Sequence, residues 1–133
     1  MNARWWIIVG AVLAAAAVLA GAFGAHGLKQ RVKTGLMTAE KLEVFDTAAR
    51  NQMIHAIGLI LVGLALRAGG PSMAAQIAGA AFLLGIVLFC GWLYANALSG
   101  NVALPLLAPI GGLSFVVGWI ALAVAAWGWT AAR

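Results

Sequence analysis

Charge is what this sequence lacks most. Asp, Glu, Lys and Arg make up 8% of its 133 residues, and only three of these side chains are acidic, whereas an average soluble domain is about 25% charged. Apolar residues make up 65% of the chain. A soluble domain of this size leaves about a third of its unfolded surface in water, an area that so few charged side chains cannot cover. The composition therefore excludes a soluble globule and predicts that lipid surrounds most of the chain.

Cysteine and proline are also scarce. The single cysteine, Cys90, excludes an internal disulfide, and we expect its side chain to be a small buried apolar group. The sequence contains no zinc-ligand spacing, no Gly-rich phosphate loop and no Gly-x-Ser-x-Gly or His-Glu-x-x-His motif. We therefore expect no metal, no other cofactor and no enzymatic activity.

Long stretches without any charged residue predict the membrane spans. They cover residues 5–28, 51–66 and 68–132. A hydrocarbon core of about 30 Å needs about 20 helical residues, so the first stretch holds one helix and the last holds two. The middle stretch spans the membrane only if its helix begins near Asp46, which places Asp46 and Arg50 one turn apart, where they can pair. Turn-forming residues at 68–72 and 98–101 delimit the later helices.

The sequence therefore predicts an all-α fold, an integral membrane bundle of four transmembrane helices in a single domain, residues 1–133. The helices are expected at about residues 5–25, 46–66, 73–97 and 103–129, with a basic loop over 26–45. Strands are excluded because four segments cannot close a barrel, and an open sheet in lipid leaves amides unpaired. Pro105 falls in the first turn of the fourth helix. Pro109 lies further along and is expected to kink or loosen that helix, together with Gly111 and Gly112 just beyond it.

The number of spans bears on orientation, because an even number places both termini on the same side of the membrane. Aromatic rings gather at membrane interfaces, and four tryptophans stand near the two chain ends: Trp5, Trp6, Trp127 and Trp129. The cations on this terminal side are Arg4, Arg67 and Arg133. The first loop carries slightly more, namely Lys29, Arg31, Lys33 and Lys41, with Arg50 at its boundary. Since cytoplasmic loops carry the excess of Lys and Arg, the count leans weakly toward termini on the outside. The basic loop is expected to contact anionic lipid headgroups and not nucleic acid.

Small residues on the first helix predict a packing surface. Ala17, Gly21 and Ala25 recur at four-residue spacing, and small side chains let transmembrane helices approach closely. We expect this row to lie against another helix and not against lipid.

Polar residues at the start of the second helix form a second pattern. Thr47, Asn51 and His55 share one helical stripe, and Gln52 lies beside it. Polar groups at membrane depth normally face other helices or a wet cavity. His26 closes the first helix, so an antiparallel hairpin is expected to bring it near His55. The two histidines are interpreted either as a proton relay or ligand site, or as structural hydrogen-bonding groups. Together with Glu43 they match no closed metal site.

Three motifs in order resemble a known family. They are Gly24-Ala25-His26-Gly27, then Phe45-x-Thr47-Ala48 leading to Gln52-x-x-His55, and Pro109-Ile110-Gly111-Gly112. Together they resemble the YgdD family, also called the domain-of-unknown-function 423 family, over essentially the whole chain. The resemblance implies a small multi-pass protein of the bacterial inner membrane, related to eukaryotic transmembrane protein 256, with no established activity. The resemblance implies that the positions of interest are His26, Thr47, Gln52, His55 and the segment 109–112. Asn51 departs from the family, in which an aromatic residue is expected.

Two functional hypotheses follow. The first is a non-enzymatic helical module that acts through helix packing or through association with membrane partners, including copies of itself. The alternative is an oligomeric transport or channel element in which His26, Asn51, Gln52 and His55 line a wet path. An enzyme is the weakest hypothesis, because no nucleophile and base or open metal position is visible.

Overall fold

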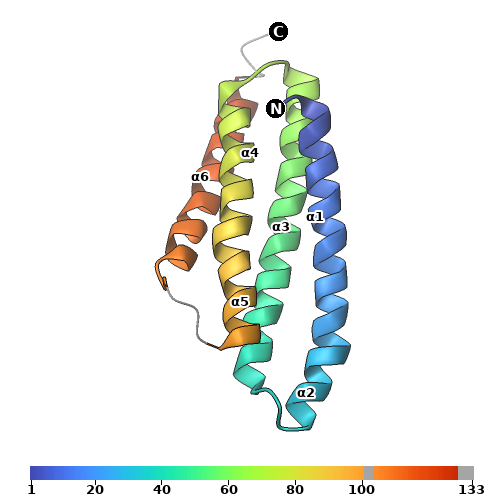
Figure 1. Ribbon diagram of the computed structural model, residues 1–133. Coiled ribbons are helices and arrows are strands. Elements are labelled where there is room, and N and C mark those ends of the chain that lie inside the picture. The colour runs from blue at the N-terminus through green and yellow to red at the C-terminus, as the bar shows by residue number, and fades with distance from the viewer. Residues whose placement is uncertain (101–103, 129–133) are drawn as a thin grey trace.

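Four antiparallel helical rods make up the described part of the chain, residues 1–100 and 104–128, in the computed structural model (Figure 1). The first two rods are α1 (Ala3–Phe23) continued by the π-helical turn η1 (Gly24–Leu28) and α2 (Lys29–Lys33), and then α3 (Ala39–Gly69). The third is α4 (Met73–Gly85), the π-helical turn η2 (Ile86–Cys90) and α5 (Gly91–Ser99), and the fourth is α6 (Leu107–Trp127). All four rods are long and apolar enough to cross a membrane. The predicted all-α class with four spans is confirmed.

Local sequence signals begin and end these helices. Asn2, Thr38 and Ser72 precede α1, α3 and α4, and each side chain accepts a hydrogen bond from the backbone amide three residues later. Gly70 and Gly100 follow α3 and α5 with positive φ angles of 79° and 80°, which favour glycine because it has no Cβ. Both glycines lie in the turns that the sequence predicts.

The first hairpin differs from the prediction. The sequence predicts a loop over residues 26–45, whereas only residues 34–38 separate α2 from α3. The prediction ended each helix where charged residues begin, but charge ends a membrane span without ending a helix. Each of these two rods has 31 residues, or about 46 Å at about 1.5 Å per residue, so its charged end extends beyond a hydrocarbon core of about 30 Å. Within this hairpin, Asp46 and Arg50 do not form the ion pair that their spacing allows.

The fourth helix also corrects the prediction. It begins at Leu107, so Pro105 lies in the preceding turn and Pro109 is the third residue of α6. The first backbone amides of a helix have no partner within that helix, so a proline there costs little and causes no kink. Gly111 follows as a buried packing position. The predicted helix ends at Ala103 and Trp129, the turn residue Asn101 and the cation Arg133 lie outside the described residues.

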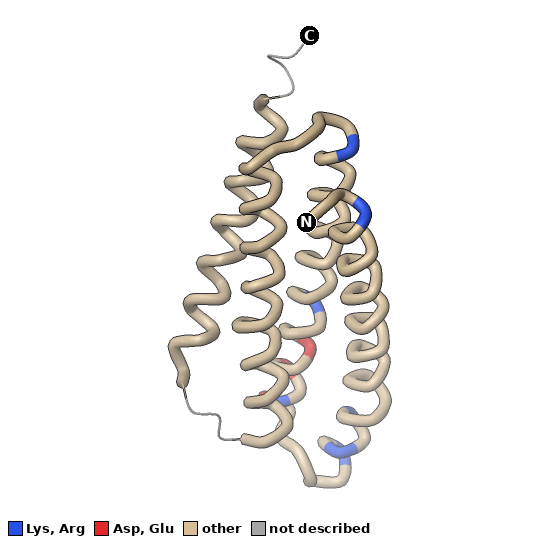
Figure 2. The backbone as a smooth tube through the Cα atoms, turned by 45° about the horizontal axis from the view of Figure 1, so that its top comes forward, with Lys and Arg blue, Asp and Glu red and all other residues tan. Residues whose placement is uncertain are grey.

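The rods pack in the order α1, α3, α4 with α5, and α6. α1 packs mainly on α3, and α6 packs mainly on α4 and η2. Half of the most apolar stretch of α3 is buried, compared with 17% for the first rod and for α6. Figure 2 shows charged residues at the end that contains the N-terminus and in the opposite half of the first two rods, whereas the third rod and α6 carry none. The two flanking helices therefore present most of their apolar surface to the bilayer.

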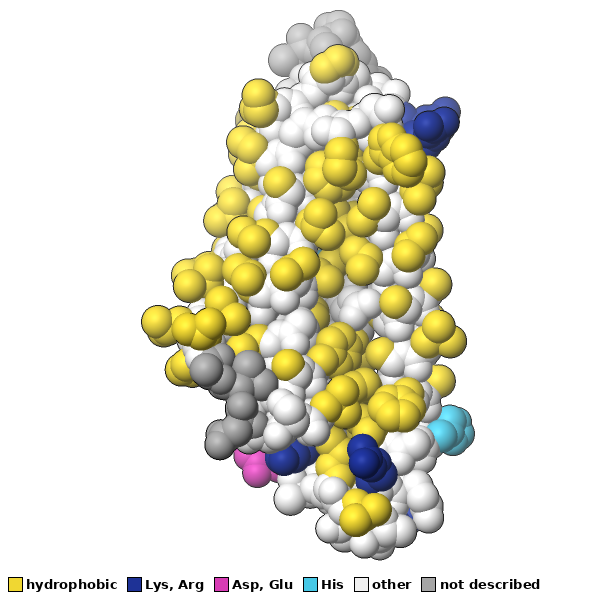
Figure 3. All heavy atoms as spheres, in the orientation of Figure 1, with side chains coloured by type: hydrophobic (Ala, Val, Ile, Leu, Met, Phe, Trp, Pro, Cys, Tyr) yellow, Lys and Arg dark blue, Asp and Glu magenta, His cyan; other side chains and the backbone are white. Residues whose placement is uncertain are grey.

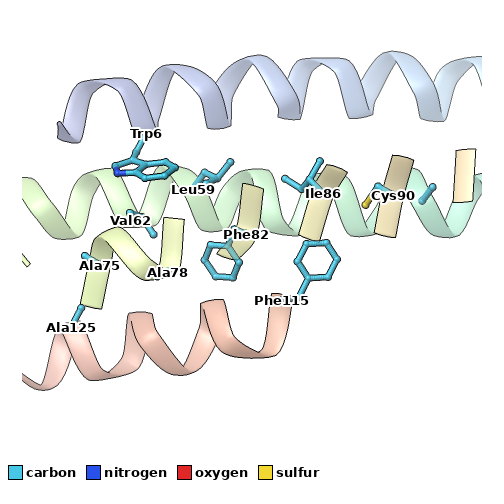
Figure 4. Close-up of a cluster of buried hydrophobic side chains, with 11 residues drawn as sticks. Trp6, Leu59, Val62, Ala75, Ala78, Phe82, Ile86, Cys90, Phe115 and Ala125 are labelled. Atoms are coloured by element: carbon cyan, nitrogen blue, oxygen red, sulfur yellow. The ribbon is translucent and has the colours of Figure 1, made fainter. Parts of the chain in front are cut away.

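One buried cluster connects all four rods (Figure 4). Trp6 of α1 and Val62 of α3 lie near one end, and Phe82, Phe115 and Cys90 follow toward the other. The buried position of Cys90, which is 1% exposed, agrees with the apolar role expected of it.

Candidate functional site

The predicted row of small residues is only partly a packing surface. Ala17 is buried, but Ala25 is exposed, and a Cβ added to Gly21 would meet nothing within 4 Å. Residues four apart are separated by about 40° around a helix, so the row turns away from α3 as it proceeds. The expectation that Gly21 and Ala25 lie against another helix is wrong within this chain.

The close approach of α1 and α3 occurs at other glycines. A Cβ on Gly10 would lie 2.7 Å from the carbonyl oxygen of Ala56, and one on Gly63 would lie 2.7 Å from that of Ala3. Small residues recur here every seven positions, at 3, 10, 17 and 24 on the first rod and at 49, 56 and 63 on α3. A seven-residue step returns to nearly the same face of a helix, with a drift of about 20°. The sequence contains this seven-residue repeat, but the prediction followed the four-residue spacing of Ala17, Gly21 and Ala25 instead.

Gln52 and His55 are both buried, but they face different helices. Gln52 is 7% exposed, and its Nε2 donates a hydrogen bond of 2.9 Å to the carbonyl oxygen of Leu13 on α1. His55 is 5% exposed, and its ring stacks on Phe115 of α6 with 3.4 Å between ring centroids and 7° between planes. The two side chains therefore tie α3 to α1 and to α6 separately.

Two local hydrogen bonds complete the polar stripe. Asn51 Nδ2 donates to the carbonyl oxygen of Thr47 at 2.9 Å, and His55 Nδ1 lies 2.7 Å from the carbonyl oxygen of Asn51. Because a carbonyl oxygen only accepts, Nδ1 carries the hydrogen of this contact. Thr47 itself is half-buried beside a shallow cavity of about 230 Å³ whose other lining residues are Glu40, Glu43, Val44 and Leu93. Backbone carbonyls of the helices thus satisfy the amide and imidazole donors of this stripe.

His26 lies apart from these residues. It is exposed on η1, where Gly24 approaches Phe45 and Asp46 of α3. Leu13, by contrast, lies opposite Gln52. The rise from Leu13 to His26 is about 20 Å at about 1.5 Å per residue, so His26 and His55 are not neighbours. The expected cluster of His26, Thr47, Asn51, Gln52 and His55 is therefore not a single site. In the described residues, no group of three or more His, Cys, Asp or Glu side chains is placed to hold a metal ion.

Aromatic rings around His55 form the part of the site that sequence reasoning missed. Phe82 lies 5.7 Å and Trp119 6.1 Å from the histidine ring, centroid to centroid. Glycines provide the space for the two phenylalanines: a Cβ on Gly118 would overlap Phe82, and one on Gly85 would overlap Phe115. Isolated glycines within apolar helices were the available signal, but without the helix pairing they could not be matched to their rings.

Gln76 at the start of α4 is a second missed residue. Its Oε1 accepts hydrogen bonds from the Met1 amino group at 3.1 Å and from Trp6 Nε1 at 3.0 Å, and its Nε2 donates to the Met1 carbonyl oxygen at 2.5 Å. These bonds join the beginning of α1 to α4. Next to them, between the two helices, is a groove of about 600 Å³ lined by Met1, Trp6, Gln76, Ala80, Leu83, Leu84 and Val87. Figure 3 shows hydrophobic side chains along α4 and α1 on this face.

Four apolar antiparallel helices, with buried polar side chains bonded to neighbouring backbone, define a small multi-pass helical membrane protein. The chain belongs to the family described as "Protein of unknown function (DUF423)", which matches residues 20–112. This confirms the resemblance seen in the three sequence motifs.

Named relatives agree with this class. The UPF0382 membrane protein SERP0230 of Staphylococcus epidermidis is 39% identical over 120 residues, covering 90% of this chain and 93% of the relative. The UPF0382 membrane protein YwdK of Bacillus subtilis is 39% identical over 122 residues, covering 91% and 94%. A UPF0382 membrane protein of Haemophilus influenzae is 39% identical over 107 residues, covering 80% of each chain. No solved structure matches the chain.

Proposed function

We propose that this protein is a non-enzymatic helical module of the bacterial inner membrane, which acts by binding another apolar transmembrane helix. The observation that carries the proposal is the groove of about 600 Å³ between α1 and α4. It is open to the bilayer, and its lining residues are apolar apart from Gln76, whose amide is already bonded to α1.

Its dimensions suit one helix. The lining residues on α4 and η2 run from Gln76 to Val87, a rise of about 16 Å at about 1.5 Å per residue, or roughly half of a hydrocarbon core. Ala80 in the middle offers the small side chain that lets a second helix approach. Because lipid tails are as apolar as leucine side chains, the driving force is close packing between the two helices.

The groove is tested with a photoreactive side chain at Leu84, which lies in the groove and is half-exposed. Crosslinking is performed in native membranes, and the product is identified by mass spectrometry. Ala80→Phe fills the groove one turn away, whereas Ala15→Phe places the same ring on the exposed outer face of α1. We expect a protein product, from a second copy or another membrane protein, that Ala80→Phe abolishes and Ala15→Phe leaves intact. Products with lipid alone, or a protein product that survives Ala80→Phe, contradict the proposal.

A flux assay distinguishes the transport alternative from the association proposal. Gln52 and His55 are bonded to backbone carbonyls and covered by α1 and by aromatic rings, which favours a structural role for both. We expect vesicles containing the purified protein to be no leakier to protons or small ions than empty vesicles. A flux that His55→Phe removes while the helix content stays unchanged replaces the association proposal with the transport one.

We also propose that the end of the molecule containing residues 34–38 faces the cytoplasm, with both termini outside. The cations Lys29, Arg31, Lys33 and Lys41 lie at that end, against Arg4 and Arg67 at the other, and cytoplasmic ends carry the excess of Lys and Arg. Thr34→Cys and Asn2→Cys report the orientation, because both positions are exposed whereas the native Cys90 is buried. In intact cells, a membrane-impermeant maleimide is expected to label position 2 and not position 34. The reverse pattern overturns the orientation.

A further inference from the structure

A small cavity with two cationic side chains lies at the end of the bundle that contains the first hairpin turn. It has a volume of about 90 Å³ and is lined by Arg31, Leu36, Met37, Lys41, Ala97 and Leu98. These residues come from α2, from the turn over residues 34–38, from α3 and from α5. Three rods therefore meet around it, and the two cations approach it from different helices.

The carboxylates of this region lie elsewhere. Glu40 and Glu43 line the separate cavity beside Thr47 and Leu93. No ion pair within 4 Å joins Arg31 or Lys41 to a carboxylate in the part of the chain that the structure describes. Two cations that share a cavity without a counter-charge repel each other, so an anion placed between them is favoured by both.

The side chain of Lys41 reaches the end of α5. Its Nζ lies 2.7 Å from the point where a Cβ on Gly100 would stand, so the side chain lies across the glycine that ends α5. The carboxyl end of a helix carries about half a negative charge, which attracts the ammonium group but does not neutralise two cations. Lys41 therefore lies beside both the cavity and the end of α5, with net positive charge remaining.

The surroundings suit an amphiphilic ligand. Leu36 is 74% exposed and Leu98 is 52% exposed, so apolar side chains flank the cations. If the hydrocarbon core begins at Trp5, about 20 residues of helix end near Ala25, and Arg31 lies about 9 Å further along at about 1.5 Å per residue. This is the depth of the lipid headgroups, where phosphate groups are concentrated. A cavity holds one water molecule from about 10–15 Å³ upward, so the volume of about 90 Å³ leaves room for a single phosphate group.

We propose that this cavity binds the phosphate group of an anionic phospholipid, with Arg31 and Lys41 as its cationic ligands. The guanidinium of Arg31 is suited to a bidentate contact with two phosphate oxygens, and the ammonium of Lys41 binds as a point charge. Leu36 and Leu98 contact the apolar part of the lipid next to the headgroup. The site is separate from the groove between α1 and α4, because no residue lines both.

The test compares two double variants that remove the same charge. Arg31→Gln with Lys41→Gln removes both proposed ligands, whereas Lys29→Gln with Lys33→Gln removes two exposed cations of the same hairpin that do not line the cavity. Purified protein in an uncharged detergent is titrated with phosphatidylglycerol or phosphatidylcholine, and bound lipid is counted by native mass spectrometry. General attraction to an anionic surface accounts for about a fivefold change for each cation and affects both double variants equally. The site predicts that the first pair weakens phosphatidylglycerol binding at least tenfold more than the second.

A charge-conserving exchange and a free anion complete the test. Arg31→Lys with Lys41→Arg keeps two cations at the cavity and is expected to retain most of the binding. Inorganic phosphate that displaces the lipid from the unaltered protein shows that the phosphate group is the recognised part. Binding of inorganic phosphate without any preference for phosphatidylglycerol supports the site and assigns it to the free anion. Equal losses in the two double variants, or no selective binding of either anion, overturn the proposal. Unchanged thermal unfolding of each variant shows that it remains folded.

Discussion

Replacing Gly10 with alanine tests the contact between α1 and α3 directly. The new Cβ would lie 2.7 Å from the Ala56 carbonyl oxygen and 3.0 Å from the Ile60 amide nitrogen, both backbone atoms of α3, whereas ordinary contact begins at 3.4 Å. The helices must separate locally by about 0.7 Å to restore that contact, and such overpacking costs about 1–3 kcal/mol. Gly21→Ala is the matched control, because its Cβ meets open space.

Both substitutions gain up to about 1 kcal/mol of helix propensity, so the difference between them isolates the packing cost. We expect Gly10→Ala to be less stable than Gly21→Ala by about 1–3 kcal/mol, and Gly21→Ala to be at least as stable as the unaltered protein. Unfolding by a denaturing detergent in mixed micelles, followed by circular dichroism and tryptophan fluorescence, measures the difference. Stabilities equal within about 0.5 kcal/mol would show that the two helices do not approach closely at Gly10.

Substitutions at three further positions test the polar contacts. Gln52→Leu removes the hydrogen bond to α1 and should cost about 0.6 kcal/mol, the average for interhelical hydrogen bonds in membranes, in the same unfolding assay; a cost above about 3 kcal/mol would indicate a larger polar network. His55→Phe keeps a ring against Phe115 and should cost less than about 1.5 kcal/mol, whereas His55→Ala leaves a cavity and should cost about 2–5 kcal/mol; equal costs would contradict the stacked geometry. Gln76→Leu removes the acceptor of the hydrogen bond that Trp6 Nε1 donates and should change tryptophan emission with little loss of helix, as fluorescence and circular dichroism together will show.

The number of helices and most of their limits could be predicted from the sequence. Uncharged stretches mark the membrane spans and turn-forming residues mark the helix ends, and both signals are local in the sequence. Gly70 and Ser72 both belong to the turn predicted over residues 68–72, where Gly70 has a positive φ and Ser72 caps α4. The two helices of the first hairpin are longer than the sequence predicts, because the prediction placed Lys29 and Glu40 in the loop. They lie on helices that continue into the headgroup region, where charge is compatible with helical structure.

The candidate site was harder to predict because it depends on how helices pair. Gln52 and His55 were expected to face inward, and both are buried. Gln52 faces α1 whereas His55 faces α6. This difference follows from the order in which the rods pack, and the spacing of residues along one helix gives no information on that order. His26 was placed beside His55 without a register between α1 and α3, and the contact of Gly24 with Asp46 sets that register.

The unequal lengths of the rods bear on how this protein fits a bilayer. α6 has 21 residues, or about 31 Å at about 1.5 Å per residue. This length matches the hydrocarbon thickness of an average bilayer, about 30 Å, without any excess length. In a thicker bilayer the longer rods still span the hydrocarbon core, but α6 is shorter than that core. The surrounding lipid must then thin, or the ends of α6 must lie within the hydrocarbon, at a cost of fractions of a kcal/mol per Å of mismatch. We therefore expect α6 to be the helix most sensitive to the thickness of the surrounding membrane.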